Sequence, residues 1–152
     1  MVSDKEQLRA MISSYSLRLS CGSSSRDSLS EYYVDVKSAG MAAAGVLLFG
    51  RIILSRLQEE GWNVQAVGGR ETCSWLVAST LAAAQLNGLE LRGFLLRKEG
   101  RGLTISGFCR RGAQVVVLEE VATESALVTR VVNRVREIGM NPVGSITVVD
   151  RE

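Results

Sequence analysis

The sequence contains no histidine and only one proline and three cysteines among 152 residues. Without histidine, no Ser-His-Asp or Cys-His nucleophile can operate within the chain, so a general base near neutral pH has to be a carboxylate, a lysine or a thiolate. The cysteines Cys21, Cys73 and Cys109 lie far apart and form no CxxC pair, which argues against a structural zinc site. We therefore expect reduced, mostly buried thiols, and any catalysis should rest on positioning and electrostatics.

An excess of one charge and a long apolar run are also missing. Eighteen basic and 16 acidic residues give a net charge of +2, which predicts no nucleic-acid partner. The most apolar run, residues 39–50, is interrupted at Arg51 and is shorter than the roughly 20 residues that cross a bilayer. The polar segment 1–6 has capping-box spacing and is typical of a helix start rather than a signal peptide. These features predict a cytoplasmic protein without a membrane partner.

What the sequence does contain is an alternation of strand and helix patterns. Helices are predicted at 4–19, 38–60, 71–85 and 124–138, and strands at 31–37, 63–67, 91–96, 103–109, 114–118 and 143–149. The run QVVVL at 114–118 is continuously apolar, as in strands buried on both faces of a parallel sheet. Strand-helix-strand order with short loops predicts an α/β fold with a doubly wound, mostly parallel sheet and flanking helices.

The length and composition predict one domain, residues 1–152, with an N-terminal helix and strand at 1–37 and a core at 38–152. Three polar segments follow predicted strands, namely 68–71 (GGRE), 97–102 (RKEGRG) and 119–123 (EEVAT). In such sheets ligands bind beyond the carboxyl ends of the strands. A glycine-rich, a basic and an acidic loop together suit a phosphorylated sugar. Strand ends are also polar simply because water covers them, so no single loop carries this interpretation.

The order and spacing of these segments add a family resemblance. Residues 114–127 (QVVVLEEVATESAL) resemble the phosphoribosyl diphosphate motif of type I phosphoribosyltransferases, an apolar strand followed by two acidic residues and a phosphate loop that opens a helix. Residues 30–35 (SEYYVD), 97–99 (RKE) and 149–152 (VDRE) resemble segments of the orotate phosphoribosyltransferase branch. The resemblance spans nearly the whole chain and implies a type I phosphoribosyltransferase-like fold with a small N-terminal hood element.

The resemblance also implies a reaction and a set of site residues. Orotate and phosphoribosyl diphosphate would give orotidine monophosphate and pyrophosphate through an oxocarbenium-like transition state, with Mg2+ held mainly by the diphosphate and a homodimer as the assembly. The implied catalytic residues are Arg101 and Glu120. The implied phosphoribosyl diphosphate-binding residues are Arg97, Lys98, Arg70, Glu119, Glu120, Thr123, Glu124, Ser125, Ala126 and Leu127. The implied orotate-binding residues are Tyr32, Tyr33, Thr123 and Arg151.

The phosphate loop departs from the family pattern. Residues 123–127 (TESAL) contain no glycine, although backbone amides have to approach the 5′-phosphate closely in such a loop. Glu124 suits the start of a helix, but a carboxylate about 4 Å from a phosphate is repelled by roughly 1 to 4 kcal/mol. That repulsion is expected to weaken phosphate binding by about one to three decades.

The segment implied to form the catalytic loop is altered too. Arg101 replaces the family lysine, the following histidine is missing, and the loop is short. Residues 22–25 (GSSS) have serine where the family has a base-contacting lysine, and Arg26 stands nearby. At the segment 68–72 the family lysine is missing, and Arg70 can supply a cation instead.

Two functional hypotheses follow, and the sequence leaves open whether the chain is an enzyme. We favour an orotate phosphoribosyltransferase-like protein of pyrimidine nucleotide metabolism with weak or no catalysis, which acts as a binding or regulatory subunit for phosphoribosyl diphosphate or a nucleotide-like molecule. The alternative is an active orotate phosphoribosyltransferase that uses Arg70 and Arg101. A third reading attributes the resemblance to a shared doubly wound architecture alone.

Overall fold

The centre of the molecule is a five-stranded sheet with the strand order β5-β4-β3-β6-β7. The computed structural model describes residues 2–19, 32–100, 102–122 and 125–150, with the backbone alone described at 16–19, 32–33 and 125–126. The strands are β3 (Ala66–Arg70), β4 (Arg92–Glu99), β5 (Gly102–Gly107), β6 (Gln114–Ala122) and β7 (Asn141–Asp150). Neighbouring strands are parallel except at β5, which pairs antiparallel with β4 at one side of the sheet.

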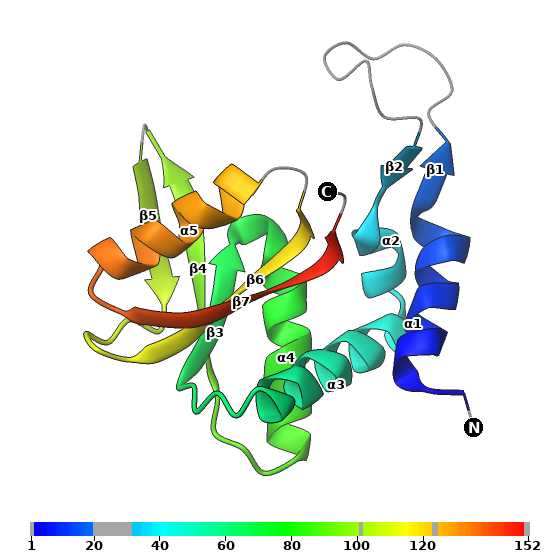
Figure 1. The fold of residues 1–152 in the computed structure, drawn as a ribbon, viewed down its shortest axis with the longest axis horizontal. Coiled ribbons are helices and arrows are strands. Elements are labelled where there is room, and N and C mark those ends of the chain that lie inside the picture. The colour runs from blue at the N-terminus through cyan, green and yellow to red at the C-terminus, as the bar shows by residue number, and fades with distance from the viewer. Residues whose placement is uncertain (1, 20–31, 101, 123–124, 151–152) are drawn as a thin grey trace.

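Helices cover both faces of the sheet, as Figure 1 shows. The helix α5 (Ser125–Glu137) packs on one face, against β6 and β7. The helices α3 (Ala43–Glu59) and α4 (Ser74–Leu86) pack against each other on the opposite face, and a 3₁₀ turn (Glu71–Cys73) leads from β3 into α4. The predicted α/β fold with a mostly parallel sheet and flanking helices is therefore confirmed.

The position of strand β6 inside the sheet, between β3 and β7, explains why its residues 115–118 are continuously apolar and do not alternate with polar ones. Successive side chains of a strand point to opposite faces, and here both faces are covered. Val115 and Val117 join the core between the sheet and α5, whereas Val116 and Leu118 join the core on the side of α3 and α4. All four side chains are fully buried, which confirms the prediction of a central strand at 114–118.

The N-terminal segment forms a separate layer beside α3. It begins with α1 (Asp4–Met11), in which Ser3 and Glu6 form the predicted capping box, and continues through a π-helical turn (Ile12–Ser16). Strand β1 (Leu17–Leu19) then pairs antiparallel with β2 (Tyr32–Val34). The predicted single helix over 4–19 is therefore wrong, because its last residues gain backbone partners in β2 instead of continuing the helix.

Two further predicted boundaries are wrong in the segment that follows. The strand expected at 31–37 ends at Val34, because the Asp35 side chain accepts a hydrogen bond from the Lys37 amide (3.2 Å) and starts α2 (Val36–Gly40). The single helix expected at 38–60 is interrupted between α2 and α3. A Cβ atom on Gly45 would lie 1.9 Å from the Ala39 carbonyl oxygen, so the two helices meet where glycine leaves room for the backbone.

The glycines at 68 and 69 lie inside β3 rather than in the predicted loop 68–71. A Cβ atom on Gly68 would lie 2.3 Å from the Phe94 carbonyl oxygen, and one on Gly69 would lie 2.3 Å from the Leu118 carbonyl oxygen. The sheet therefore needs glycine at both positions because the neighbouring strands leave no space for a side chain.

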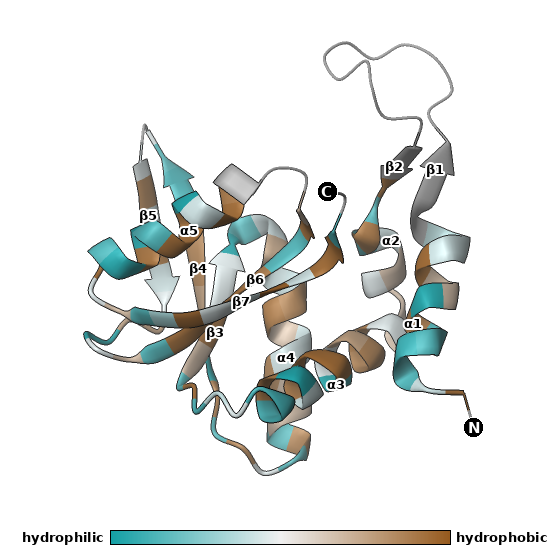
Figure 2. Cartoon of the chain, viewed as in Figure 1, coloured by the Kyte–Doolittle hydropathy of each residue, from teal (hydrophilic) through white to brown (hydrophobic). Residues whose placement is uncertain are grey.

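Hydropathy follows these layers, as Figure 2 shows: α3 and α4 are largely hydrophobic, whereas α1 is mostly hydrophilic. Phe49 and Ile53 of α3 are buried in the core, whereas Leu47 of the same helix is exposed. Within the described ranges, no helix is both long enough and apolar enough to cross a membrane.

Candidate functional site

The carboxyl ends of β3 and β6 lie side by side and bring Arg70 next to Glu119. Two hydrogen bonds join the pair: Arg70 Nε donates to Glu119 Oε2 (3.0 Å) and Arg70 Nη2 donates to Glu119 Oε1 (2.7 Å). The Glu119 side chain is 2% exposed and the Arg70 side chain 32%. A bidentate pair of opposite charges is among the strongest polar contacts in proteins. Arg70 is therefore the counterion of a buried carboxylate.

Two more donors reach the same carboxylate. The Cys73 Sγ donates to Glu119 Oε1 (3.5 Å), and the backbone amide of Glu120 donates to the same oxygen (3.2 Å). Burial, reinforced by the Glu119 charge, raises the pKa of the Cys73 thiol to about 12. Cys73 is thus a neutral hydrogen-bond donor near neutral pH, and the hydrogen-bonding capacity of Glu119 is used within the protein.

Glu120 has a different environment from Glu119. Its Oε1 accepts a hydrogen bond from the indole Nε1 of Trp75 in α4, and its Oε2 lies 3.8 Å from the Lys37 Nζ of α2. The side chain is 15% exposed. Burial raises the pKa of the Glu120 carboxyl, while the Trp75 hydrogen bond and the Lys37 charge oppose that rise. Glu120 is the more accessible and more loosely held of the two carboxylates.

The difference follows from the backbone. The predicted loop 119–123 is wrong over residues 119–122, because β6 continues to Ala122 and stays paired with β7, while Thr123 lies outside the described residues. Adjacent residues in a strand point to opposite faces, so Glu119 contacts Arg70 and Glu120 contacts α4 and α2. The two carboxylates therefore do not form a cluster with a common ligand position.

In the basic segment 97–102, where residue 101 lies outside the described residues, residues 97–99 end β4 and Gly102 starts β5, so these residues do not form the predicted loop. Arg97 and Lys98 belong to β4 and pair across the hairpin with β5. Gly100 has a φ of 58°, which suits the tight turn between the strands. The Arg97 Nε lies 3.6 Å from Glu71 Oε1, and both side chains are more than 60% exposed. Such an exposed pair contributes about 1 kcal/mol or less, so Arg97 can change partners at small cost.

The remaining predicted site residues are placed in part or not at all. Tyr32 and Tyr33 lie in β2 and Ser125 and Ala126 begin α5, each with its backbone alone described. Leu127 is half-buried in the first turn of α5. Outside the described residues lie Arg101, Thr123, Glu124, Arg151, Cys21 and the segment 22–26. Of the predicted set, the structure brings Arg70 and Glu119 into contact and directs the neighbouring Glu120 to the opposite face of β6.

Sequence reasoning missed three residues that complete this site: Lys37, Cys73 and Trp75. They come from α2, the 3₁₀ turn and the first turn of α4, and they reach carboxylates far away in the sequence. The sequence held one indication for Cys73 and Trp75. They follow shortly after the strand that ends in Arg70, and ligands bind at the carboxyl ends of such strands. Lys37 gave no comparable signal.

The donor set is unsuited to a metal ion held by the protein alone. Among the residues that the structure describes, no three histidine, cysteine or acidic side chains gather closely enough to bind a metal ion. Both Glu119 oxygens accept bonds from protein groups. A divalent cation would have to arrive with an anionic ligand and contact Glu120 from outside.

Comparison with known proteins gives a consistent set of relatives. No protein-family model matches the chain. The orotate phosphoribosyltransferase of Aquifex aeolicus is 31% identical over 157 residues, covering 98% of this chain and 85% of that protein.

Solved structures agree with this result. Mycobacterium tuberculosis orotate phosphoribosyltransferase in complex with Fe(III) dicitrate superimposes with a TM-score of 0.84 at 25% identity, covering 98% of this chain and 85% of that one. The same protein in complex with 5-phospho-alpha-D-ribosyl 1-diphosphate gives a TM-score of 0.77 at 24% identity, covering 99% and 78%. The similarity includes the N-terminal layer as well as the sheet and its helices.

Proposed function

The chain belongs to the orotate phosphoribosyltransferase family, and we propose that it binds phosphoribosyl diphosphate with weak or no turnover, as a binding or regulatory subunit in pyrimidine nucleotide metabolism. The observation that carries this proposal is the bidentate contact between Arg70 and Glu119. The family resemblance gives Arg70 to the diphosphate and Glu119 to the ribose, yet here each side chain is the partner of the other. Glu119 is not free for a ligand unless the buried pair breaks, and Arg70 offers a ligand only the N–H donors that do not bond Glu119.

Breaking that pair is unfavourable. Removing one partner of a buried ion pair typically costs about 3–5 kcal/mol, and the partial exposure of Arg70 puts this pair at the lower end. A ligand that displaces one partner replaces part of the lost contact, so its binding free energy is reduced by at most that amount. A loss of about 3 kcal/mol corresponds to roughly two decades of affinity. The pair therefore favours weak binding of a ligand that contacts the Glu119 carboxylate.

Glu120 is the carboxylate that remains available for ribose hydroxyls. Arg97 and Lys98 supply exposed positive charge for the diphosphate, and the Mg2+ ion comes with that diphosphate. In this proposal residues 123–127 receive the 5′-phosphate, and Tyr32, Tyr33 and Arg151 contact orotate. Glu120 and Arg101 are the groups nearest the reaction.

The second candidate function is an active orotate phosphoribosyltransferase. It is favoured by the loose hold on Glu120, whose contact with the Lys37 ammonium is 3.8 Å long and easily exchanged for a ligand. In this case the chain makes orotidine monophosphate and pyrophosphate, with Glu120 and Arg101 beside the departing diphosphate. The protein contributes positioning and charge stabilisation, since it contains no histidine for proton transfer.

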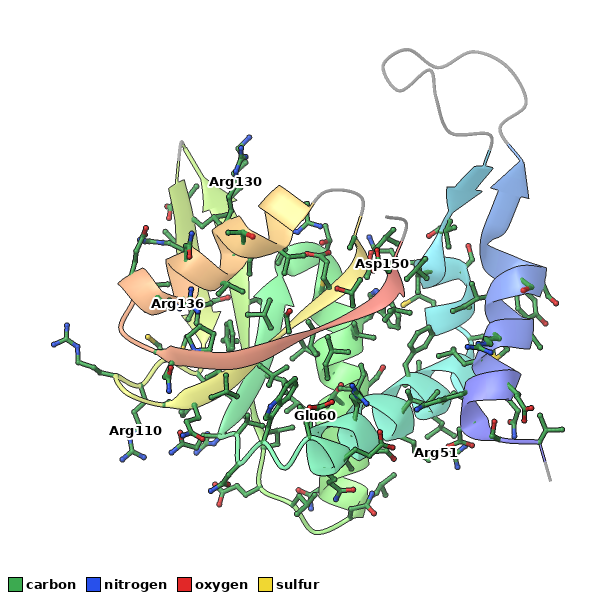
Figure 3. All side chains as sticks on the ribbon, in the orientation of Figure 1. Arg51, Glu60, Arg110, Arg130, Arg136 and Asp150 are labelled. Atoms are coloured by element: carbon green, nitrogen blue, oxygen red, sulfur yellow. The ribbon has the colours of Figure 1, made fainter. Side chains whose placement is uncertain are left out.

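Titration calorimetry with phosphoribosyl diphosphate and Mg2+, paired with an absorbance assay of orotate consumption, tests both candidates. We expect measurable binding that Glu120→Gln weakens about tenfold, because a hydrogen bond to a charged group is lost. The control is Arg110→Gln, since Arg110 is exposed and projects away from the site (Figure 3). Binding without orotate consumption supports the first candidate, and consumption that Glu120→Gln abolishes supports the second. Absence of binding would overturn both.

The family relationship supports three further parts of the proposal. The chain forms one domain, in which residues 1–37 are the hood unit and residues 38–152 the core. It assembles as a homodimer and works in the cytoplasm. Sedimentation equilibrium of the purified chain at micromolar concentration tests the assembly, and a mass equal to one chain at all concentrations would contradict it.

A further inference from the structure

A cavity of about 290 Å³ lies at the end of the sheet opposite the candidate site. Its lining residues belong to the carboxyl-terminal ends of α3 and α4 and to the two connections that lead into β3 and β4. These segments lie at the lower end of the view in Figure 1. Its walls include the apolar side chains of Leu57, Trp62 and Leu91, with Gln58, Asn63 and Glu90 among them. None of these residues belongs to the candidate site.

Local backbone geometry creates the space. Gly61 and Gly88 follow α3 and α4 with φ values of 64° and 67°, so both chains turn sharply in a conformation that favours glycine. A Cβ atom at either position would meet no other atom within 4 Å. The Trp62 indole rests on Gly144 of β7, where a Cβ atom would lie 2.4 Å from its Cη2. The indole is held against the sheet and leaves the space between the helix ends open.

The cavity offers hydrogen-bonding groups that the protein itself does not use. Across the described ranges, no hydrogen bond engages the side-chain amide of Gln58 or Asn63, whereas nearby Gln65 accepts one from the Gln114 backbone (2.8 Å). Apolar walls with a few free polar groups are typical of small-molecule sites. Trp62 adds an aromatic face, which binds cations and other rings.

The charge around the opening is negative. Two helices end here, and the carboxyl-terminal end of a helix carries a partial negative charge. Glu90 adds a carboxylate that is 90% exposed and lies 3.9 Å from its nearest cation, Arg92. The other acidic groups at the end of α3, Glu59 and Glu60, are paired with Arg56. Glu90 is therefore the acidic group best able to attract a positively charged ligand.

We propose that this cavity is a second small-molecule site, which takes a compact aromatic cation, an amidinium or ammonium carried on one ring. A cavity of about 150 Å³ lined by apolar side chains holds benzene, so this volume accommodates one ring with its substituent. The ring packs on Trp62 and the apolar walls, and the cation lies toward Glu90. The amide of Asn63 or Gln58 accepts a hydrogen bond from it.

The chain carries its own reporters for a test, because one of its two tryptophans lines the cavity and the other contacts Glu120 in the candidate site. Benzamidine is titrated into the ¹⁵N-labelled protein while the two indole N–H signals are followed, with Trp62→Phe used for assignment. Benzyl alcohol and benzoate serve as neutral and anionic comparators. We expect a saturable shift of the Trp62 signal, with affinities in the order benzamidine, benzyl alcohol, benzoate, and no shift of the Trp75 signal.

Three substitutions, one of them a control, sharpen the test. Gln58→Phe places a ring in the opening and should weaken benzamidine binding about tenfold or more, whereas Ser55→Phe, at an exposed position of α3 outside the cavity, should leave it unchanged. Glu90→Gln should weaken benzamidine about two- to fivefold and leave benzyl alcohol unchanged.

Other results would overturn the proposal. Equal affinity for the three probes would exclude a cation site, and an unaffected Trp62 signal would exclude binding. A Trp62 signal that changes on dilution without any probe would mean that a second copy of the chain covers the cavity. Addition of phosphoribosyl diphosphate, read at Trp75, tests the candidate site separately, so failure of one proposal is distinguishable from failure of the other.

Discussion

At the scale of single residues, two adjacent glutamates are held by different parts of the molecule. Glu119 is enclosed by Arg70, Cys73 and a backbone amide, whereas Glu120 faces the helices α4 and α2. The first carboxylate is a structural counterion and the second is a group that a ligand can reach. Substitutions at these positions should therefore affect stability and binding unequally.

Replacing Arg70 tests the structural part. Arg70→Gln leaves the Glu119 carboxylate buried without its cation, and we expect a loss of about 3 kcal/mol in the free energy of unfolding. Arg97→Gln is the matched control, since Arg97 is in an exposed ion pair worth about 1 kcal/mol or less. Urea denaturation followed by circular dichroism measures both. Equal losses in the two variants would mean that the Arg70 pair contributes no more than a surface contact.

The pH dependence of stability tests Glu120. Burial raises the pKa of this carboxyl in the folded state, so the folded protein binds the proton more tightly than the unfolded chain. The stabilisation from that proton is complete below the unfolded pKa, near 4.5, and is lost as pH rises through the folded pKa.

The measurement compares wild type with Glu120→Gln, in which the amide still accepts the Trp75 hydrogen bond. The wild-type free energy of unfolding minus that of Glu120→Gln should fall as the pH rises above 4.5 and then level off. A difference that rises over this interval would show that Lys37 and Trp75 outweigh burial.

At the scale of elements, strand β3 and its neighbours set the position of the site. The glycines at 68 and 69 allow the flanking strands to approach, and the register then puts Arg70 one residue beyond the pair Gly69 and Leu118. A shift of the strand by one residue would turn Arg70 to the other face, away from Glu119. The ion pair between Arg70 and Glu119 therefore depends on the close packing of β3 between β4 and β6.

A methyl group at position 69 should therefore destabilise the sheet. The Cβ of Gly69→Ala would lie 2.3 Å from the Leu118 carbonyl oxygen, so the backbone has to shift, at a cost of about 1–3 kcal/mol. For a domain of this size each kcal/mol lowers the melting temperature by roughly 2–4 °C. In the control, Gly102→Ala, the nearest atom would be 3.8 Å away. Calorimetry should show a lower melting temperature for the first variant and little change for the second.

Most of these helices and strands could be predicted from the sequence, but the strands predicted for β3, β4 and β6 stopped before their polar carboxyl-terminal residues. The central strand at 114–118 and the helix at 124–138 follow from apolar patterns, and both are close to the observed bounds. The segments at 68–71, 97–102 and 119–123 looked like loops because they contain glycine or charge. Pairing with partner strands keeps residues 68–70, 97–99, 102 and 119–122 in the sheet, and a single-chain pattern holds no information on partners.

For the candidate site, too, the sequence predicted several of the residues but not the contacts between them. Family resemblance identified the acidic residues and Arg70, but it assigned Arg70 and Glu119 to a ligand. Their mutual contact depends on register and burial, which appear only when the strands are packed. The break between α2 and α3 was missed for the same reason, since the alanines at 39 and 42–44 favour one long helix, and the need for glycine at position 45 is known only from the close approach of the two helices.

At the scale of the whole molecule, the N-terminal layer and the sheet share one core. Leu8 of α1, Val36 of α2 and Phe49 of α3 belong to the same buried cluster as Val116 and Leu118 of the central strand. On the surface, an ion pair also joins α1 to α3: the Arg51 Nε lies 3.2 Å from the Asp4 Oδ2. The shared core predicts that both parts unfold together.

Leu8→Ala tests that cooperativity. Loss of a buried leucine side chain typically costs about 2–5 kcal/mol, and because Leu8 is 9% exposed we expect about 2 kcal/mol. Tryptophan fluorescence reports on the core and far-ultraviolet circular dichroism on all helices. The two curves should shift together in urea. Separate midpoints for the two signals would show that the N-terminal layer unfolds on its own. The control is Arg51→Ala, whose exposed ion pair should contribute about 1 kcal/mol or less.

Strand β7 has a consequence for behaviour in concentrated solution. It is ten residues long and last in the strand order, so one side pairs with β6 while its other side meets no strand within the described ranges. Such an edge offers free amide and carbonyl groups to any extended peptide. Edge strands of soluble proteins often carry lysine or an inward charge, yet the segment 141–150 holds a single charge, Asp150, at its very end. Colloidal stability of this protein therefore depends on whatever shields that edge.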